Sequence, residues 1–302
     1  MKEILVLGGT RFFGKELVKE LIKKGNNITI LTRGNLENTF EGNVKHIIAD
    51  RSNKESLEKA VDGLKFDIIY DNICYSPNDA LISTEVFKNK VKRYIVTSSA
   101  AVYGNIKKIG LKESDFNPKN YKISFGKRED FSYEEGKRLM EAVFSKYASF
   151  EVVMVRFPII IGVNDYTNRL NKYIQEISEN KKIYIKKIDS KINFITDGEA
   201  AIFLRWLMKK EIKGPINAAC YGDVSLGEII NIIEEECGEQ AIVDKTMDVL
   251  DTSPYTKFSG MTLSTVCIRS FFNYRFKDAR SEMRSIVKEI IETKNRNCIK
   301  TP

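Results

Sequence analysis

The sequence predicts an α/β fold, a doubly wound parallel sheet followed by a smaller, more helical lobe. Two observations carry this prediction. Residues 4–7 form an unbroken apolar run that passes through a glycine-rich turn, residues 8–14, into an amphipathic helix. Short apolar strands and helices then alternate up to about residue 156, beyond which the alternation weakens. Such alternation is typical of βαβ units and therefore of a parallel sheet.

The glycine-rich turn is the first candidate binding site. The apolar run before it suits a strand buried on both faces. After it, Phe13, Leu17 and Leu21 recur at helical spacing, and Gly25 stands where a helix C-cap is expected. A turn of this kind lets backbone N–H groups and a helix N-terminus face a phosphate. An ordinary βα turn can carry the same glycines, so only the flanking strand and helix favour a nucleotide site.

The remaining elements of the sheet follow in order. Apolar runs predict further strands at residues 28–31, 44–48, 67–70, 93–97 and 151–155. Helical spacing predicts helices at residues 52–61, 77–89 and 132–147. Ser52 is the expected N-cap of the first of these helices, and Pro77 falls in the first turn of the second.

Two parts of the chain do not follow this alternation of strands and helices. Residues 104–131 are a long polar excursion without clear periodicity, and such stretches usually carry function or disorder. Short helical patterns also occur late in the chain, at residues 166–178, 200–208, 225–237 and 278–292. We therefore expect a nucleotide-binding domain at residues 1–160, its sheet completed by part of residues 190–220. A smaller substrate-binding lobe is expected at residues 161–302, over the C-terminal edge of the sheet.

Composition excludes several classes of protein. No apolar run approaches the roughly 20 residues that span a bilayer, and the first residues lack a secretory signal. The five cysteines are scattered without a CxxC pair, which favours a reducing cytoplasm and argues against disulfides or a metal site. The one histidine, His46, lies in a predicted strand, so we expect a structural role. The net charge of +8 is spread thinly, which favours an anionic small-molecule ligand over nucleic acid.

Tyr133 and Lys137 are the strongest catalytic candidates. They are four residues apart on a predicted helix and so share a face. An ammonium group beside a phenol favours the phenolate, and a phenol tuned in this way can exchange a proton near neutral pH. Tyr103 and Lys107 have the same spacing by chance, but they lie in a turn, where residues four apart do not face each other.

Hydroxyl side chains follow the strand at residues 93–97. The sequence Thr97-Ser98-Ser99 places them at the C-terminal end of a central strand, where ligands bind in doubly wound sheets. Serines in this position are more often turn or cap residues than catalytic ones. Ser99 is therefore a catalytic candidate only in combination with the tyrosine and lysine.

Together these motifs resemble the extended short-chain dehydrogenase/reductase family, in particular its NAD-dependent epimerase/dehydratase-like members, including atypical ones. The resemblance covers nearly the whole chain in order. The matching segments are residues 8–14, Ala49-Asp50-Arg51, residues 98–104, Tyr133-xxx-Lys137, residues 155–158 with Gly162, residues 193–197 and residues 214–217.

The resemblance implies a Rossmann fold and an oxidoreductase that moves a hydride between a nicotinamide and a carbinol carbon. Ser99 would orient the substrate oxygen, and Tyr133 would be the acid/base. Lys137 would hold the nicotinamide ribose and lower the pKa of the phenol, and Asp50 would contact the adenine. The implied cofactor-binding set is Gly8, Thr10, Arg11, Phe12, Phe13, Gly14, Arg33, Asp50, Arg51, Tyr75, Thr97, Lys137 and Phe157. No metal site is expected.

Four departures from the family pattern bear on the cofactor and the substrate. Arg11 replaces the middle glycine of the turn, as in a divergent branch that includes plastid RNA-associated proteins. Thr32 and Arg33 stand where an acidic residue usually binds the adenosine ribose, which favours NADP over NAD. Residues 71–75 replace the usual small-residue loop. Gly136 replaces a common serine, with little expected consequence.

The sequence therefore predicts a cytoplasmic NAD(P)-dependent epimerase, dehydratase or reductase. Its expected substrate is a nucleotide-activated sugar or a related hydroxyl compound, and a homodimer through helices near Tyr133 and Pro77 is possible. The alternative is a non-catalytic nucleotide-sensing or RNA-binding protein on the same fold, motivated by the positive charge and by Arg11. The substrate, the net reaction and the choice of cofactor stay open at this point.

Overall fold

The computed structural model describes residues 1–37, 39–40, 42–104, 106–244 and 253–299. The chain divides into two compact units. The first, called the sheet unit here, contains Met1–Asn105, Lys112–Phe157 and Gly198–Ala218. The second, called the small unit, contains Ile106–Leu111, Pro158–Asp197 and Ala219–Pro302. The chain thus passes between the units several times.

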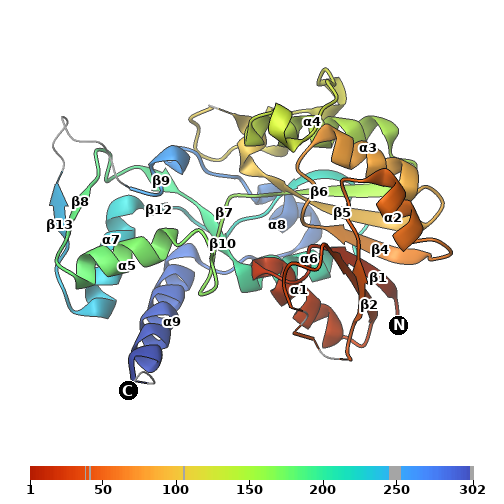
Figure 1. The fold of residues 1–302 in the computed structure, drawn as a ribbon. Coiled ribbons are helices and arrows are strands. Elements are labelled where there is room, and N and C mark those ends of the chain that lie inside the picture. The colour runs from red at the N-terminus through yellow and green to blue at the C-terminus, as the bar shows by residue number, and fades with distance from the viewer. Residues whose placement is uncertain (38, 41, 105, 245–252, 300–302) are drawn as a thin grey trace. The chain divides into compact units, whose positions relative to one another are not determined.

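A seven-stranded parallel sheet forms the centre of the sheet unit, so the predicted fold class is confirmed (Figure 1). The strand order is β11-β6-β5-β4-β1-β2-β3. Most of the strands are nearly continuous apolar runs, as expected for strands covered on both faces. The strands are β1 (Glu3–Leu7), β2 (Asn27–Thr32), β3 (Lys45–Ile48), β4 (Phe66–Asp71), β5 (Val91–Ser99), β6 (Glu151–Phe157) and β11 (Gly214–Asn217).

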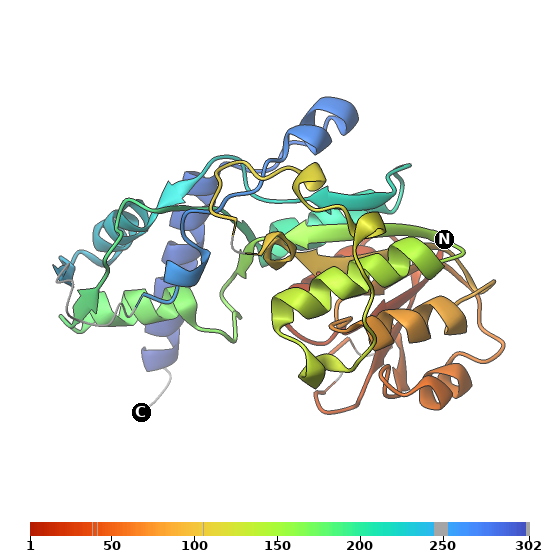
Figure 2. The ribbon, with the colours of Figure 1, turned by 90° about the horizontal axis from the view of Figure 1, so that it is seen from above.

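Helices cover both faces of this sheet. On one face α2 (Lys54–Ala60), α3 (Pro77–Val86) and α4 (Tyr133–Tyr147) pack side by side (Figures 1 and 2). On the other face lie α1 (Phe12–Ile22) and α6 (Asp197–Leu207), joined by an ion pair between Arg205 and Glu20. The resulting three layers leave the C-terminal ends of the strands at one common edge.

Three predicted helix ends differ from the observed ones. Asn53 rather than Ser52 caps α2, because the Asn53 side chain accepts a hydrogen bond from the Ser56 N–H. Gly25 is not the C-cap of α1; the helix ends at Ile22, and Lys23 takes the cap position. Helix α3 ends three residues before the predicted end at Asn89, a residue that adopts a left-handed backbone with φ of 61°.

The polar excursion at residues 104–131 contains short 3₁₀ turns rather than a regular helix. A buried arginine holds part of it in place. The Arg156 guanidinium donates to the carbonyl oxygens of Glu113 and Phe116, at 2.9 and 3.0 Å, and forms an ion pair with Glu141. Because Arg156 extends from β6, this part of the excursion is tied to the sheet.

Within its described residues, the small unit contains α5 (Arg169–Ser178), α7 (Leu226–Cys237), α8 (Val266–Phe272) and α9 (Ala279–Ile299) with three two-stranded pairings. Strand β7 (Ile159–Ile161) pairs with β10 (Phe194–Thr196). The others are β9 (Lys191–Ile192) with β12 (Val224–Ser225), and β8 (Lys182–Tyr184) with β13 (Ile242–Asp244). Among the described residues, no helix combines the length and the apolar character needed to cross a membrane.

Candidate active site

The strand order reverses between β1 and β4, whose neighbours on the far sides are β2 and β5. A parallel doubly wound sheet binds ligands at such a point, beyond the carboxyl ends of the strands. Leu7 at the end of β1 is in register with Asp71 at the end of β4, so the turns after the two strands meet. The Asn72 side-chain amide reaches the Gly8 carbonyl oxygen at 3.5 Å. The candidate site is this edge of the sheet unit.

The glycine-rich turn leaves no room for side chains at its two ends. Gly8 has a φ of 80°, and a Cβ there would lie 2.6 Å from the Ile73 side chain. A Cβ on Gly14 would lie 2.3 Å from the Gly8 carbonyl oxygen. Phe12, the first residue of α1, has a φ of 50°, which is strained for a bulky residue. The turn therefore has the close backbone approach that a bound pyrophosphate requires.

Lys137 lies at the centre of the candidate site. Its side chain is 1% exposed, and its ammonium group donates to the carbonyl oxygens of Cys74 and Thr97, each at 2.8 Å. Burial lowers the pKa of Lys137, while the nearby Tyr75 acts in the opposite direction. The Lys137 nitrogen lies 5.9 Å from the centre of the Tyr133 ring and 4.7 Å from the centre of the Tyr75 ring. A buried cation thus stands beside two phenols.

The hydroxyl groups at the end of β5 have separate partners. The Thr97 hydroxyl donates to the Asn72 side-chain oxygen at 2.9 Å. Ser98 donates to the buried Glu141, which makes it a structural residue. The Ser99 hydroxyl accepts a hydrogen bond from the Ala101 N–H at 3.2 Å and is partly exposed. Ser99 is therefore the hydroxyl of this strand that a ligand at the edge can reach most readily.

Tyr133 is the first residue of α4, after the N-cap Ser132, and is 49% exposed. Its ring centre lies 6.4 Å from that of Tyr75. The structure thus brings Tyr133, Lys137, Thr97 and Tyr75 to one edge of the sheet. The chance pair Tyr103 and Lys107 behaves differently: the Tyr103 hydroxyl is buried against Asn217 and Arg156.

Arg51 takes a different place from the rest of the proposed cofactor-binding set. Its side chain is 5% exposed and forms ion pairs with Asp71 and Asp79. It also donates to Ser83, at 2.9 Å. Although burial alone would lower the pKa of the guanidinium, Asp71 and the groups around it raise the pKa well above its ordinary value. The side chain is committed to this network, so only the backbone of Arg51 remains for a cofactor.

Arg33 and Asp50 lie at the ends of β2 and β3 and are more open to solvent. Arg33 is exposed, and its charge helps to lower the pKa of Asp50, behind the larger effect of hydrogen bonds from Ser52. The Thr32 hydroxyl bonds to His46 Nε2 at 2.9 Å, within the sheet as expected for a structural histidine. The charged side chains of Arg33 and Asp50 therefore lie where the adenosine end of a dinucleotide is predicted to bind.

Aromatic residues complete the set around the glycine turn. Phe157, at the end of β6, is 1% exposed and its ring centre lies 6.2 Å from that of Phe13. Phe13 in turn contacts the ring of Phe12, at 6.0 Å between centres. Thr10 is partly buried and Arg11 is exposed. Phe157 thus supports the turn from beneath, and Arg11 is on its solvent side.

Sequence reasoning missed two features of this edge. Gly136 was expected to matter little, yet a Cβ there would lie 2.5 Å from the Tyr75 carbonyl oxygen. Arg128 was not singled out, yet its guanidinium lies 4.4 Å from the centre of the Tyr75 ring. The one feature of the sequence that could have marked Gly136 and Arg128 as site residues is that both lie within five residues of Tyr133.

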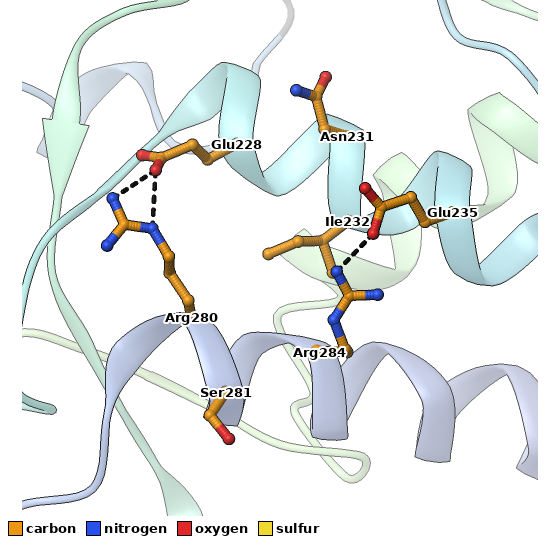
Figure 3. Close-up of a pocket in the computed structure, with 7 residues that line it drawn as sticks. All are labelled: Glu228, Asn231, Ile232, Glu235, Arg280, Ser281 and Arg284. Carbon is orange, nitrogen blue, oxygen red and sulfur yellow. Dashed lines mark hydrogen bonds and ion pairs between the residues drawn. The ribbon is translucent and has the colours of Figure 1, made fainter.

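Two surface grooves lie away from this edge. One, of about 740 Å³, runs along residues 118–125 and the C-terminal half of α4. The other, of about 390 Å³, lies between α7 and α9 in the small unit (Figure 3). Its arginines are engaged, because Arg280 is paired with Glu228, and Arg284 with Glu235 and Glu236. No cluster of three or more metal-binding side chains occurs within the described ranges.

Parts of the sequence and the overall fold resemble known proteins. Residues 4–76 match the model of the NAD dependent epimerase/dehydratase family. The chloroplast stem-loop binding protein of 41 kDa b from Arabidopsis thaliana is 30% identical over 115 residues, 34% of this chain and 30% of that protein. UDP-glucose 4-epimerase from Lactobacillus helveticus is 27% identical over 165 residues, 47% of this chain and 46% of that enzyme. The matches thus span less than half the length of these two relatives.

A solved structure extends the likeness to the whole fold. UDP-glucuronic acid 4-epimerase from Bacillus cereus, in complex with NAD, has a TM-score of 0.72 over 96% of each chain, at 15% identity. The likeness at this identity concerns the fold, whereas the family match concerns the glycine turn and the first four strands. The resemblance read from the sequence is therefore confirmed over residues 4–76, which match the NAD dependent epimerase/dehydratase family, and nearly the whole chain shares the fold of a solved epimerase.

Proposed function

We propose that the protein is an NAD(P)-dependent epimerase, dehydratase or reductase that acts on a nucleotide-activated sugar or a related hydroxyl compound. The observation that carries the proposal is the buried ammonium group of Lys137, placed beside the Tyr133 ring at the edge where the strand order reverses. Support also comes from two of the three named similar proteins, a UDP-glucose 4-epimerase and a UDP-glucuronic acid 4-epimerase complexed with NAD.

The residues at the edge fit a nicotinamide dinucleotide. Gly8 and Gly14 form a turn that a Cβ would fill, which suits a pyrophosphate on the N-terminus of α1. Asp50 would contact the adenine, and Lys137 and Thr97 lie near the place of the nicotinamide ribose. When bound, the nicotinamide supplies a two-electron acceptor and donor for the carbon that carries the substrate hydroxyl.

The roles of the protein groups follow from their chemistry. Tyr133 takes the proton from the substrate hydroxyl and returns it in the reverse step. Lys137 stabilises the phenolate of Tyr133 by its positive charge. Ser99 holds the substrate oxygen in position for this transfer. Arg33 selects NADP by pairing with its 2′-phosphate, and we further propose a cytoplasmic location and a homodimer.

Replacing Tyr133 with phenylalanine tests the central role. The change removes one oxygen and little packing, so fold and cofactor affinity should survive. Turnover of any accepted substrate should fall by about 10²–10⁴-fold, the usual contribution of a positioned proton transfer. Steady-state rates and a fluorescence titration of the cofactor, both on the same preparation, measure the two quantities. A rate within a factor of about two of the parent would refute the enzyme mechanism.

Lys137→Ala and Ser99→Ala separate the remaining roles. Without the Lys137 charge the phenolate forms only near its unperturbed pKa of about 10, so residual activity should shift to higher pH. Cofactor affinity should fall in the same variant. Ser99→Ala should lower turnover and leave the pH profile in place. Identical profiles for Lys137→Ala and the parent would contradict the role of Lys137.

RNA binding is the second candidate, because one relative is a stem-loop binding protein and the chain carries a net charge of +8. Binding through phosphates releases counterions, so affinity should fall steeply with salt. A filter-binding titration with a stem-loop RNA measures it. Affinity no tighter than about 10 µM lies inside the non-specific range and would remove this candidate.

A further inference from the structure

We propose that Arg128 and Tyr75 form an anion subsite of the candidate active site, in which Arg128 binds the phosphate group of a nucleotide-activated substrate. This inference rests on the proposed function and names a substrate contact for it. The guanidinium lies 4.4 Å from the centre of the Tyr75 ring. The Tyr75 ring in turn neighbours the Tyr133 ring, at 6.4 Å between centres. The Tyr75 ring thus lies next to both the Arg128 guanidinium and the proposed acid/base, Tyr133.

Contact with a ring leaves an arginine ready for an anion. A guanidinium over an aromatic face interacts with the ring through its charge, and its N–H groups lie in its own plane. Those N–H groups match the oxygens of a phosphate in a two-point contact, for which arginine is better suited than lysine. The ring contact limits the orientations of the side chain and so lowers the entropy lost on binding. Tyr75 therefore acts as a platform that presents Arg128.

The ring contact of Arg128 favours a ligand role over a structural one. Glu129 and Asp130 follow it directly, and both are exposed. Asp130 accepts a hydrogen bond from the Lys127 N–H at 2.7 Å. Other exposed arginines of the chain, such as Arg280 and Arg284, form ion pairs with carboxylates. Arg128 instead contacts a ring at the edge of the sheet, although carboxylates are close in sequence.

The backbone that carries Arg128 is anchored next to the site. Asn78 in α3 donates its backbone N–H to the Gly126 carbonyl oxygen at 3.3 Å. The Gly126 N–H donates to the Asn78 side-chain oxygen at 3.0 Å. This reciprocal pair fixes the segment two residues before Arg128, and Ser132 fixes it on the far side by capping α4. The backbone that carries Arg128 is thus held in place on both sides.

The backbone of Tyr75 is itself held in place by a neighbouring carboxylate. Its N–H donates to the Asp79 carboxylate at 3.0 Å, and Asp79 is paired with the buried Arg51. The Lys137 ammonium group also lies close to this ring, at 4.7 Å from its centre. The Tyr75 platform therefore neighbours both the proposed proton-transfer residue Tyr133 and the Arg128 guanidinium.

Calorimetric titration of the purified full chain tests the proposal. UDP-glucose, UDP and pyrophosphate serve as probes, and NAD and NADP are titrated separately. Arg128→Ala should weaken UDP-glucose and UDP by about 10–100-fold, since a charge-assisted hydrogen bond contributes about 1.5–3 kcal/mol. The salt dependence of UDP binding should become shallower. Arg128→Lys should restore part of the affinity, and both nicotinamide cofactors should bind as to the parent.

Lys127→Ala is the matched control, because it removes an exposed charge directly next to Arg128 in the sequence. It should leave UDP-glucose affinity within about twofold. Equal losses in the Lys127 and Arg128 variants, or a parent protein that binds no probe at millimolar concentration, would overturn the subsite. Equal weakening of NADP and UDP by Arg128→Ala would assign the cation to the cofactor and also overturn it. A parent that binds UDP-glucose but neither nicotinamide cofactor would refute the proposed function and leave the subsite standing.

Discussion

The turn after β4 and the turn after β2 open on the same edge of the sheet, but they hold their charges in opposite ways. After β4, Asp71 is fully buried and pairs with the buried Arg51. Tyr94 also donates to the Asp71 carboxylate, at 2.6 Å. After β2, Arg33 is exposed, and the Gly34 N–H donates a hydrogen bond to the Thr32 hydroxyl at 3.1 Å.

The difference suggests separate roles for the two turns: one positions Lys137, and the other selects the cofactor. The buried network fixes the backbone of residues 72–76, which provides the Cys74 carbonyl that holds Lys137. Breaking a buried ion pair by removing one partner typically costs about 3–5 kcal/mol, whereas exposed pairs contribute about 0–1 kcal/mol. The turn after β4 should therefore govern stability and the placement of Lys137. The turn after β2 should govern only which cofactor binds.

Replacing Arg51 with methionine is the strongest test of this comparison. It leaves the carboxylates of Asp71 and Asp79 buried without their cation, so unfolding free energy should fall by about 3–5 kcal/mol. Urea unfolding followed by circular dichroism measures it. The matched control is Arg33→Met, which should change stability by no more than about 0.5 kcal/mol. Similar losses in both variants would mean that burial does not distinguish the two turns.

Arg33→Ala tests the turn after β2 through cofactor selectivity. A charge-assisted bond to a 2′-phosphate contributes about 1.5–3 kcal/mol, so NADP affinity should fall by about 10–100-fold. NAD lacks this phosphate and should bind unchanged. Fluorescence titrations with both cofactors make the measurement. If the parent prefers NAD, or if both cofactors weaken equally, the NADP prediction is wrong.

Local patterns predicted the sheet and much of its edge because they depend on neighbours in sequence. The apolar runs, the glycine turn and the spacing of Tyr133 and Lys137 are of this kind. The buried network was not predictable in the same way. Arg51 pairs with Asp71 and Asp79, residues 20 and 28 positions later, and nothing in the local sequence marks such a pairing. The contact of Arg128 with Tyr75 spans 53 positions, and the close approach at Gly136 likewise depends on a distant backbone atom.

Gly136→Ala tests whether α4 also fixes the turn after β4. Alanine gains about 1 kcal/mol over glycine in a helix. Here its Cβ would lie 2.5 Å from the Tyr75 carbonyl oxygen, a backbone atom with little freedom to move. Overpacking costs about 1–3 kcal/mol, so after the gain in helix propensity we expect a net loss of up to about 2 kcal/mol in urea unfolding. In the control Gly198→Ala, the new Cβ meets no atom within 4 Å, and stability should not fall. A stabilised Gly136→Ala variant would show that the turn can yield.

Ser52→Ala tests how much the hydrogen bonds around the exposed Arg33 and the partly exposed Asp50 contribute to stability. The Ser52 hydroxyl donates to the Asp50 carboxylate at 2.7 Å, and the Ser52 N–H donates to the same oxygen at 2.9 Å. These bonds lower the pKa of Asp50. A lowered carboxyl pKa adds stability above the unfolded pKa of about 3.9, and this contribution is lost as pH falls through the folded pKa.

The expected effect of Ser52→Ala is small because Asp50 is partly exposed to solvent. At pH 7 the variant should lose less than about 1 kcal/mol, since the backbone bond to Asp50 remains and solvent screens the charge. The difference from the parent should shrink in an acid series once Asp50 is protonated in both proteins. In Asp50→Asn, adding Ser52→Ala should have no pH-dependent effect, which a double-mutant cycle by urea unfolding measures. A loss as large as that of Arg51→Met, or one that persists in acid, would place Asp50 with the buried network instead.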